Sequence, residues 1–337
     1  MTKRYTIQDV AKAAGVGVGT VSRVLNGDPN VRAATRGRVQ RTIERLGYQP
    51  SFAARSLRTQ QSHVIGFVAD AVATTPYAVE VIKGAQACAW ENEKLLLVVD
   101  AGGDEGLRER ALGVMLEREV EGLVYAAMFH QEVTLSDKFG ALPTVLVDCY
   151  TADGRFAACV PDEVQGGFDA TRQLLSHGHL RVAIILNDAL ESPYPAPKGR
   201  LEGYQRALRE AGIAPDPELV RVGDGNAASS FALTRDLMAL PRPPSAIFCC
   251  TDRMALGCYD ALKNLGLRIP EDVSVVGFDN QAAIAEQLYP PLSTVALPHE
   301  AMGRWAVERL LNPTADATRH VLPCPLVERA SVGRAAA

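Results

Sequence analysis

The apolar positions near the N-terminus repeat at the spacing of a helix rather than that of a strand. In TIQDVAKAAG, Ile7, Val10, Ala11 and Ala14 follow the i, i+3, i+4, i+7 pattern. Thr6 opens this segment and an acid follows three residues later, which is the spacing of a capping box. The pattern predicts a helix that begins after Thr6 and ends before the glycines that follow.

Two further helical segments complete the first fifty residues. After Gly17 the apolar positions Val21, Val24 and Leu25 face one side, and Asn26-Gly27 is a sequence that ends helices in a left-handed cap. A third helix is predicted from about residue 35 to residue 46, with an apolar stripe on one face, arginines on the others and a glycine as its stop. Helices joined by a tight glycine-containing turn predict a helix-turn-helix module over residues 1–50.

The three spaced glycines of GVGVG are a candidate phosphate-binding loop. Such a loop needs a strand leading into it, and a helix precedes Gly15 here. The spacing also differs from both G-x-G-x-x-G and the P-loop pattern. With no nucleophile elbow and no H-E-x-x-H in the chain, we expect a protein that is not an enzyme and that uses no cofactor.

From residue 63 onward, near-continuous apolar runs alternate with amphipathic segments. The runs are 64–70, 94–100, 122–127, 143–148, 181–186, 245–250 and 273–279. Buried parallel strands have this appearance, and the amphipathic segments between them supply the crossovers. The pattern before about residue 160 recurs after it, which predicts an α/β core of two doubly wound parallel lobes. We place lobe one at about 63–160 and 291–325, and lobe two at about 161–290, with a ligand cleft between them.

Charge is distributed unevenly along the chain. The overall net charge is −4, yet residues 1–60 contain eleven lysines and arginines against three acids. A basic N-terminal module beside an acidic remainder indicates that the module meets a polyanion such as nucleic acid. The basic segment 51–62 is too short to form a stable helix alone, and we interpret it as a linker that becomes helical only when bound.

Several separate motifs carry a family resemblance. TIQDVAKAAGVGVGTVSRVLNG and VRAATRGRVQRTIERLGYQPSFAARSLRT resemble the headpiece and hinge of the LacI/GalR (lactose-repressor) family, and VPDEVQGG, GRLEGY, TDRMALG, LRIPEDVSVVGFDN and PPLSTV continue the likeness through the core. The resemblance implies a helix-turn-helix headpiece (1–50), a hinge (51–62) and a periplasmic-binding-protein-like core (63–337). It also implies a homodimer that binds a pseudo-palindromic DNA operator under control of a small effector.

The predicted DNA-contacting residues lie on the second helix and in the hinge. Val18, Gly19, Ser22 and Arg23 share the outer face of the second helix, where Arg23 can read guanine with two donors. By resemblance, Leu57 of each chain is a wedge that enters the minor groove. The complete predicted set is Thr6, Val18, Gly19, Thr20, Ser22, Arg23, Asn26, Arg32, Tyr48, Ala54, Leu57 and Arg58.

The effector is predicted to be a carbohydrate held by an arginine and a carboxylate. The resemblance places Arg200 on a ligand-facing helix, and Asp279 ends a strand where the cleft should open. The complete predicted set is Tyr77, Tyr125, Asp162, Tyr194, Arg200, Thr251 and Asp279. A nucleobase or nucleoside effector remains an alternative, which would require two flat aromatic walls. A sugar-binding protein without a DNA-binding role would not need the basic module.

The remaining features predict an intracellular protein. The N-terminus has no apolar leader segment and no run is long enough to span a membrane, so we expect a cytoplasmic location. The seven cysteines include no Cys-x-x-Cys pair and are expected to be reduced and structural. His177 and His179 lack a nearby third ligand, so a structural role in a loop is predicted for them rather than a metal site.

Overall fold

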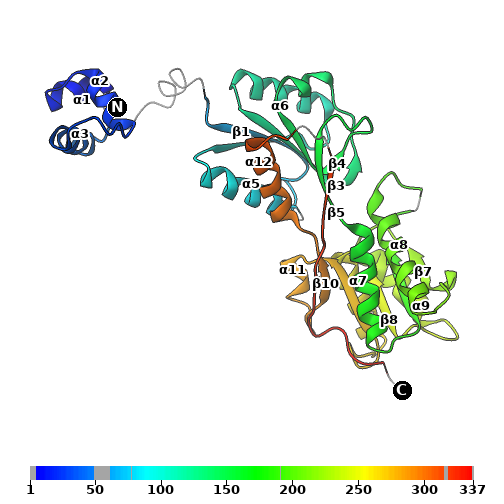
Figure 1. The fold of residues 1–337 in the computed structure, drawn as a ribbon. Coiled ribbons are helices and arrows are strands. Elements are labelled where there is room, and N and C mark those ends of the chain that lie inside the picture. The colour runs from blue at the N-terminus through cyan, green and yellow to red at the C-terminus, as the bar shows by residue number, and fades with distance from the viewer. Residues whose placement is uncertain (1–4, 49–60, 77, 190, 315–317, 336–337) are drawn as a thin grey trace. The chain divides into compact units, whose positions relative to one another are not determined.

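The computed structural model describes residues 5–48, 61–76, 78–189, 191–314 and 318–335 (Figure 1). The chain divides between His63 and Val64 into two units. In the first unit, α1 (Ile7–Ala14), α2 (Val18–Leu25) and α3 (Ala33–Leu46) pack around a small apolar core that includes Val10, Val21 and Val39.

The first unit forms the helices that its hydrophobic pattern predicts. Thr6 and Asp9 form a reciprocal capping box, in which the Thr6 hydroxyl accepts from the Asp9 amide and the Asp9 carboxylate accepts from the Thr6 amide. Left-handed glycines lie at the ends of α1 and α3, and Gly27 has a φ of 72° just after α2. The third helix starts slightly earlier than predicted, at Ala33.

The second unit contains two six-stranded sheets with matching strand orders, and these sheets define lobe one and lobe two. The order is β11-β5-β4-β3-β1-β2 in lobe one and β12-β10-β9-β8-β6-β7 in lobe two, with β12 antiparallel to β10 and the other pairs parallel. This doubly wound arrangement confirms the predicted fold class, and Figure 1 shows helices on both faces of each sheet.

Lobe one is built around the first set of apolar strands. Its strands are β1 (Val64–Asp70), β2 (Leu95–Asp100), β3 (Gly122–Glu132), β4 (Thr144–Tyr150), β5 (Ala157–Pro161) and β11 (Arg319–Leu322). Its helices are α5 (Val79–Glu91), α6 (Glu105–Glu117), η1 (Asp137–Ala141) and α12 (His299–Leu311). One apolar cluster lies between the sheet and α5 with α12, and a second lies between the opposite face and α6.

Lobe two repeats this plan. Its strands are β6 (Val182–Leu186), β7 (Val220–Val222), β8 (Ala246–Cys249), β9 (Ser274–Asp279), β10 (Ser293–Ala296) and β12 (Leu326–Val327). Its helices are α7 (Glu163–Ser176), α8 (Pro195–Glu210), η2 (Pro217–Leu219), α9 (Ala227–Met238), α10 (Asp252–Asn264) and α11 (Ala282–Ala285). The sheet packs α7 and α8 on one face and α10 on the other.

The chain crosses between the lobes after β5, after β10 and after β11. The predicted lobe boundaries differ from this course at the C-terminal side. The sequence-based prediction places residues 291–325 in lobe one. However, β10 pairs with β9 and therefore belongs to the sheet of lobe two. The hydrophobic pattern of PPLSTV is the same whichever sheet the segment joins, so the partner of β10 could not be inferred from the sequence.

Glycines permit the close packing of α7 against α8. A β-carbon on Gly203 would lie 2.1 Å from the carbonyl oxygen of Val164, and one on Gly167 would lie 2.4 Å from that of Arg200. Either clash involves backbone, which cannot move aside as a flexible side chain can. The two helices therefore approach closely enough for Glu163, at the start of α7, to reach Arg200 on α8.

The cysteines and the His177–His179 turn have structural surroundings. All seven cysteines are buried free thiols. His179 lies within hydrogen-bonding distance of the Ser245 hydroxyl through Nδ1 and of the Gly333 carbonyl through Nε2, both at 3.0 Å. These contacts tie the turn between α7 and β6 to the C-terminal segment, in agreement with the predicted structural role.

Candidate functional sites

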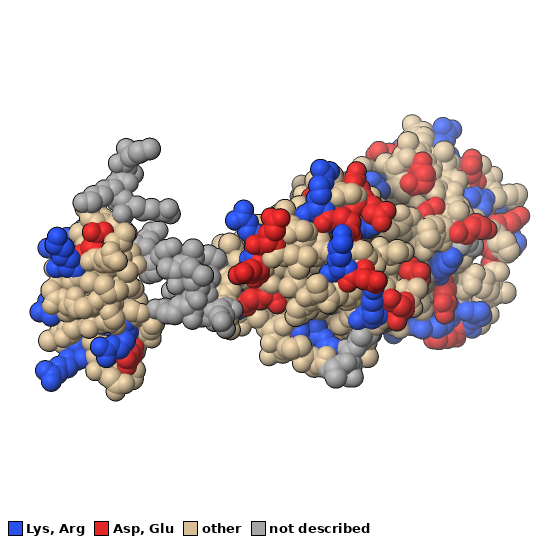
Figure 2. Space-filling model, turned by 90° about the horizontal axis from the view of Figure 1, so that it is seen from above, with Lys and Arg blue, Asp and Glu red and all other residues tan. Residues whose placement is uncertain are grey.

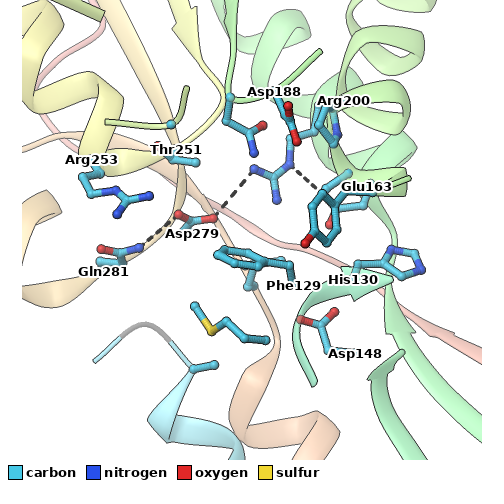
Figure 3. Close-up of a pocket in the computed structure, with 18 of the residues that line it drawn as sticks. Phe129, His130, Asp148, Glu163, Asp188, Arg200, Thr251, Arg253, Asp279 and Gln281 are labelled. Atoms are coloured by element: carbon cyan, nitrogen blue, oxygen red, sulfur yellow. Dashed lines mark hydrogen bonds and ion pairs between the residues drawn. The ribbon is translucent and has the colours of Figure 1, made fainter. Parts of the chain in front are cut away.

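A cavity of about 330 Å³ lies between the two lobes (Figure 3). Lobe one lines it with the ends of β3 and β4, and lobe two lines it with the first turns of α7, α8 and α10 and the end of β9. This is the carboxyl-terminal edge of both parallel sheets, where ligands bind in doubly wound folds. The volume is at the lower end of the ~300–1,000 Å³ typical of small-molecule sites.

The wall from lobe two is organised around the guanidinium of Arg200. Its Nε donates to Oε2 of Glu163 at 2.7 Å, and its Nη1 donates to the carbonyl of Cys250. Nη1 also lies 3.8 Å from Oδ1 of Asp279. The guanidinium carbon stacks 3.7 Å from the centre of the Phe278 ring, a cation–π contact that fixes its plane.

The charged groups in this wall shift one another's pKa values. Burial by itself lowers the pKa of Arg200, but attraction to Glu163 and Asp279 more than offsets it, so that pKa lies above its ordinary value. Burial raises the pKa of Asp279 well above its usual range, and Arg200 counteracts the shift only in part. Oδ2 of Asp279 also accepts from Nε2 of Gln281 at 3.1 Å. Arg200 is only 4% exposed, so this network is built before any ligand arrives.

The wall from lobe one is formed by an irregularity in β3. Ala126 pairs with Val147 and Gln131 pairs with Cys149, so residues 127–130 lie opposite Asp148 alone. Phe129 and Asp148 both have left-handed φ values, 69° and 56°. Bulges of this kind redirect side chains, and strained backbone concentrates at functional sites. Here the bulge and Asp148 together present side chains to the cavity.

Three polar atoms in the lobe-one wall lack partners among the described residues. Oδ1 of Asp148 and both ring nitrogens of His130 are buried and have no hydrogen bond to that part of the chain. Burial lowers the pKa of His130 to about 4, so the ring is neutral at pH 7. Burial, reinforced by Glu163, raises the pKa of Asp148 well above its usual range. Figure 3 shows both residues on the side of the cavity opposite Arg200.

An aromatic contact connects the two walls. The rings of Phe129 from lobe one and Tyr194 from lobe two have centroids 5.8 Å apart and planes at 66°, an edge-to-face arrangement. Thr251 lies nearby at the N-cap of α10, where its hydroxyl accepts from the Met254 amide. The cavity is thus lined by an aromatic contact as well as by a charged network.

The structure brings together four of the predicted effector residues, namely Tyr194, Arg200, Thr251 and Asp279, all of which line the cavity. Tyr125 does not line it. Along β3 successive side chains point to opposite faces, which directs Tyr125 into the core beneath α6, where its hydroxyl donates to Asp70 at 3.0 Å.

Asp162 is also displaced from its predicted role. Its carboxylate caps α7 by accepting from the Gln165 amide at 2.8 Å, and the next residue, Glu163, lines the cavity instead. Tyr77 lies outside the described residues. Phe129, His130, Asp148 and Glu163 also line the cavity but were not predicted, although Asp148 is recognisable as the acid that ends the apolar run PTVLVD.

The outer face of α2 is the candidate nucleic-acid interface. Val21 and Val24 are buried, whereas Val18, Gly19 and Arg23 are exposed on the opposite side. Figure 2 shows mainly basic side chains on the first unit and mixed charges on the second. A helix with this outer face fits the major groove, where a guanidinium can reach base edges.

The other predicted DNA-contacting residues have various surroundings. Thr20 and Ser22 are half-buried on α2, Asn26 ends that helix, and Arg32 is exposed at the start of α3. Thr6 is exposed but its hydroxyl is engaged in the capping box, and Tyr48 packs partly against the small core. The predicted hinge contacts Ala54, Leu57 and Arg58 lie outside the described residues.

The described residues contain neither a metal-binding cluster nor a membrane-spanning helix. Within the described residues, no cluster of histidine, cysteine and acidic side chains is suited to hold a metal ion. Over the same residues, every helix is too short or too polar to cross a lipid bilayer.

A helix-turn-helix unit joined to a two-lobed core with an interlobe cavity defines a ligand-controlled DNA-binding regulator. Residues 6–51 match the model of bacterial regulatory proteins of the lacI family, and residues 171–332 match a periplasmic binding protein-like domain. The ribose operon repressor of Escherichia coli (strain K12) is 34% identical over 97% of this chain and 99% of that protein. The chain belongs to the LacI family of bacterial transcription regulators.

Solved structures agree with this assignment. The lac repressor dimer bound to operator and the anti-inducer ONPF is 26% identical, with a TM-score of 0.78 over 98% of this chain and 100% of that one. The complex of the transcriptional regulator CelR with cellobiose is 30% identical, with a TM-score of 0.65 over 97% of this chain and 100% of that one. The relatives named here are repressors and regulators rather than enzymes.

Proposed function

We propose that this regulator is a cytoplasmic repressor whose affinity for its operator is set by a carbohydrate in the interlobe cavity. The observation that carries the proposal is the buried Arg200 network with Glu163 and Asp279. A guanidinium supplies donors and a carboxylate supplies acceptors, and neighbouring sugar hydroxyls can engage both. Similarity to a ribose operon repressor and to a regulator solved with cellobiose supports the same class of ligand.

The aromatic residues favour a sugar over a nucleobase. A nucleobase binds best between parallel aromatic faces, but Phe129 and Tyr194 meet at 66°. The remaining lining is rich in carboxylates, which suit hydroxyl donors. A single ring edge beside a polar network fits the mixed apolar and polar surface of a pyranose or furanose.

Ligand binding can regulate DNA binding only if the ligand has different affinities for two arrangements of the lobes. Because both lobes line the cavity, a ligand that contacts Arg200 on one side and Asp148 on the other favours the arrangement that brings them together. We propose that this change is transmitted to the hinge, where Leu57 and Arg58 of a homodimer contact a pseudo-palindromic operator.

The direct test of DNA recognition is selection of binding sites from a random-sequence pool with the full-length chain, followed by anisotropy titrations at fixed salt. Arg23→Ala should reduce discrimination between operator and random DNA by about 10- to 100-fold, the loss expected for one bidentate base contact. The control Arg41→Ala removes the same charge from an exposed site on α3 and should weaken binding to all DNA equally. Unchanged discrimination in Arg23→Ala would contradict the proposed interface.

The effector class is tested by calorimetry on the full-length chain with ribose, glucose and cellobiose against adenine, guanine and hypoxanthine. We expect binding of at least one sugar and no response to the bases. Tight binding of a purine together with no sugar response would replace the proposed class.

A further inference from the structure

The cavity carries an excess of negative charge. Its described lining contains five carboxylates, from Asp148, Glu163, Asp188, Asp224 and Asp279, against two guanidinium groups, from Arg200 and Arg253. Neutral sugars bring no charge to such a site, and burying carboxylates without compensation is costly. Each carboxylate therefore needs a hydrogen bond or an ion pair, either from the protein or from the ligand.

Four of the five carboxylates have partners within the protein. Glu163 pairs with Arg200, and Asp279 lies near Arg200 and accepts from Gln281. Asp188 accepts from the Ser192 hydroxyl at 2.7 Å within its own loop. Asp224 accepts from the Asn226 side chain at 2.7 Å in the same way. These groups are structural parts of the walls as well as lining residues.

Asp148 is different. It is 6% exposed, its Oδ1 has no hydrogen-bond partner, and it forms no ion pair with any described residue. Figure 3 shows its carboxylate pointing into the cavity from the lobe-one side. His130 supplies no compensating charge, because burial keeps its pKa at about 4. The charges that act on Asp148 from across the cavity are Glu163 and Asp279, which repel it, and Arg200, which is already committed to both of them.

We propose that the effector is an amino sugar, whose protonated amino group pairs with Asp148 while its hydroxyl groups contact the Arg200–Asp279 wall. An ammonium group provides three donors and the positive charge that this wall lacks. A second acceptor without a partner among the described residues, Oδ1 of Asn187, lies on the lobe-two side and suits a ligand hydroxyl. This inference rests on the proposed function and narrows its ligand class from sugars to cationic sugars.

A neutral sugar with a protonated Asp148 is the competing arrangement, and pH separates the two. Binding of an ammonium group lowers the pKa of Asp148 from its raised value in the free protein, so protons are released and affinity rises with pH. The rise should begin as pH increases above the ordinary carboxyl range and reverse once the ligand's own ammonium deprotonates. A neutral sugar that accepts a hydrogen bond from protonated Asp148 gives the opposite slope.

The test compares matched sugars on the full-length chain by calorimetry and thermal shift. The probes are glucose, glucosamine and N-acetylglucosamine, together with galactose, galactosamine and N-acetylgalactosamine. At least one amino sugar should bind ten-fold or more tightly than its neutral and N-acetyl counterparts. Asp148→Asn should abolish that preference, whereas Asp137→Asn, which removes an exposed lobe-one carboxylate paired with Arg155, should retain it.

Each outcome decides the inference. Binding of a neutral sugar with no preference for its amino counterpart, or failure of every amino sugar to bind, overturns the amino-sugar assignment. If a neutral sugar binds, the carbohydrate proposal itself survives; it fails only if purines bind and no sugar does. An unchanged preference in Asp148→Asn overturns the pairing with Asp148, and circular dichroism checks that the variant is folded.

Discussion

The two walls of the cavity differ in how far their polar groups are satisfied. In lobe two, Arg200 binds Glu163, Cys250 and Asp279 in a network that is complete without a ligand. In lobe one, the ring nitrogens of His130 and Oδ1 of Asp148 are buried and have no hydrogen-bond partner among the described residues. We call the lobe-two wall finished, because its central charged groups pair with one another even though Oδ1 of Asn187 has no partner among the described residues, and we call the lobe-one wall unfinished.

This difference suggests that the two lobes have different roles in ligand binding. A preorganised wall loses little entropy on binding and can anchor a ligand first. An unsatisfied wall gains hydrogen bonds only when the ligand arrives, so its contacts favour the liganded arrangement of the lobes over the free one. Lobe two is expected to determine whether a ligand binds, and lobe one to determine whether binding changes the protein.

The largest effect on stability is expected from removing the cation of the finished wall. Arg200→Met leaves Glu163 and Asp279 buried without their cation, which should cost about 3–5 kcal/mol of stability. Thermal unfolding should show a large decrease in Tm, and calorimetry should show no sugar binding. A variant as stable as the wild type would show that the Arg200 network is not the organising feature of this wall.

A smaller effect is expected from separating the helices that carry that network. Gly203→Ala places a β-carbon against the backbone of Val164 and should cost about 1–3 kcal/mol. The control Gly113→Ala lies in α6 with no atom near the new β-carbon and should be neutral or stabilising by up to about 1 kcal/mol. Chemical denaturation measures both; equal stability of the two variants would contradict the close approach of α7 and α8.

The neutral ring of His130 in the unfinished wall makes the protein sensitive to acid. The pKa of His130 is about 4 in the folded protein, below its unfolded value of about 6.5, so its stabilising contribution is present above pH 6.5 and lost as pH falls towards 4. His130→Phe should therefore lose less stability than the wild type between these pH values, a difference of a few degrees in Tm. If Tm depended on pH in the same way in the two proteins, the ring of His130 would not be buried as a neutral group.

The sequence was sufficient to predict the first helices, most of the central strands and much of the finished wall. Helical spacing gave α1 and α2, and apolar runs gave the central strands of both sheets. Asp279 was found because a strand ended there. Those signals are local, and the residues that carry them lie close together because the carboxyl ends of parallel strands share one edge of the sheet.

The unfinished wall was not predictable in the same way. The bulge opposite Asp148 depends on the pairing of β3 with β4, which no local pattern encodes. Tyr125 was predicted to contact the effector but lies in the core for a related reason, because the face to which a buried strand residue points cannot be inferred when both faces are apolar. Short edge strands such as β7 and β11 were also missed, since their residues are partly or fully exposed.

The most direct test of the contrast between the walls is the stability of Asp148→Asn in the absence of ligand, measured by thermal unfolding across pH. The raised pKa of Asp148 means that the folded wild type loses stability as pH rises above the unfolded value of about 3.9, through the range in which the buried carboxyl must ionise. The variant should therefore unfold at a higher temperature than the wild type at alkaline pH, and this advantage should shrink as pH falls towards the unfolded value of about 3.9. A variant less stable than the wild type at every pH would show that Asp148 already has its partners and that the lobe-one wall is finished.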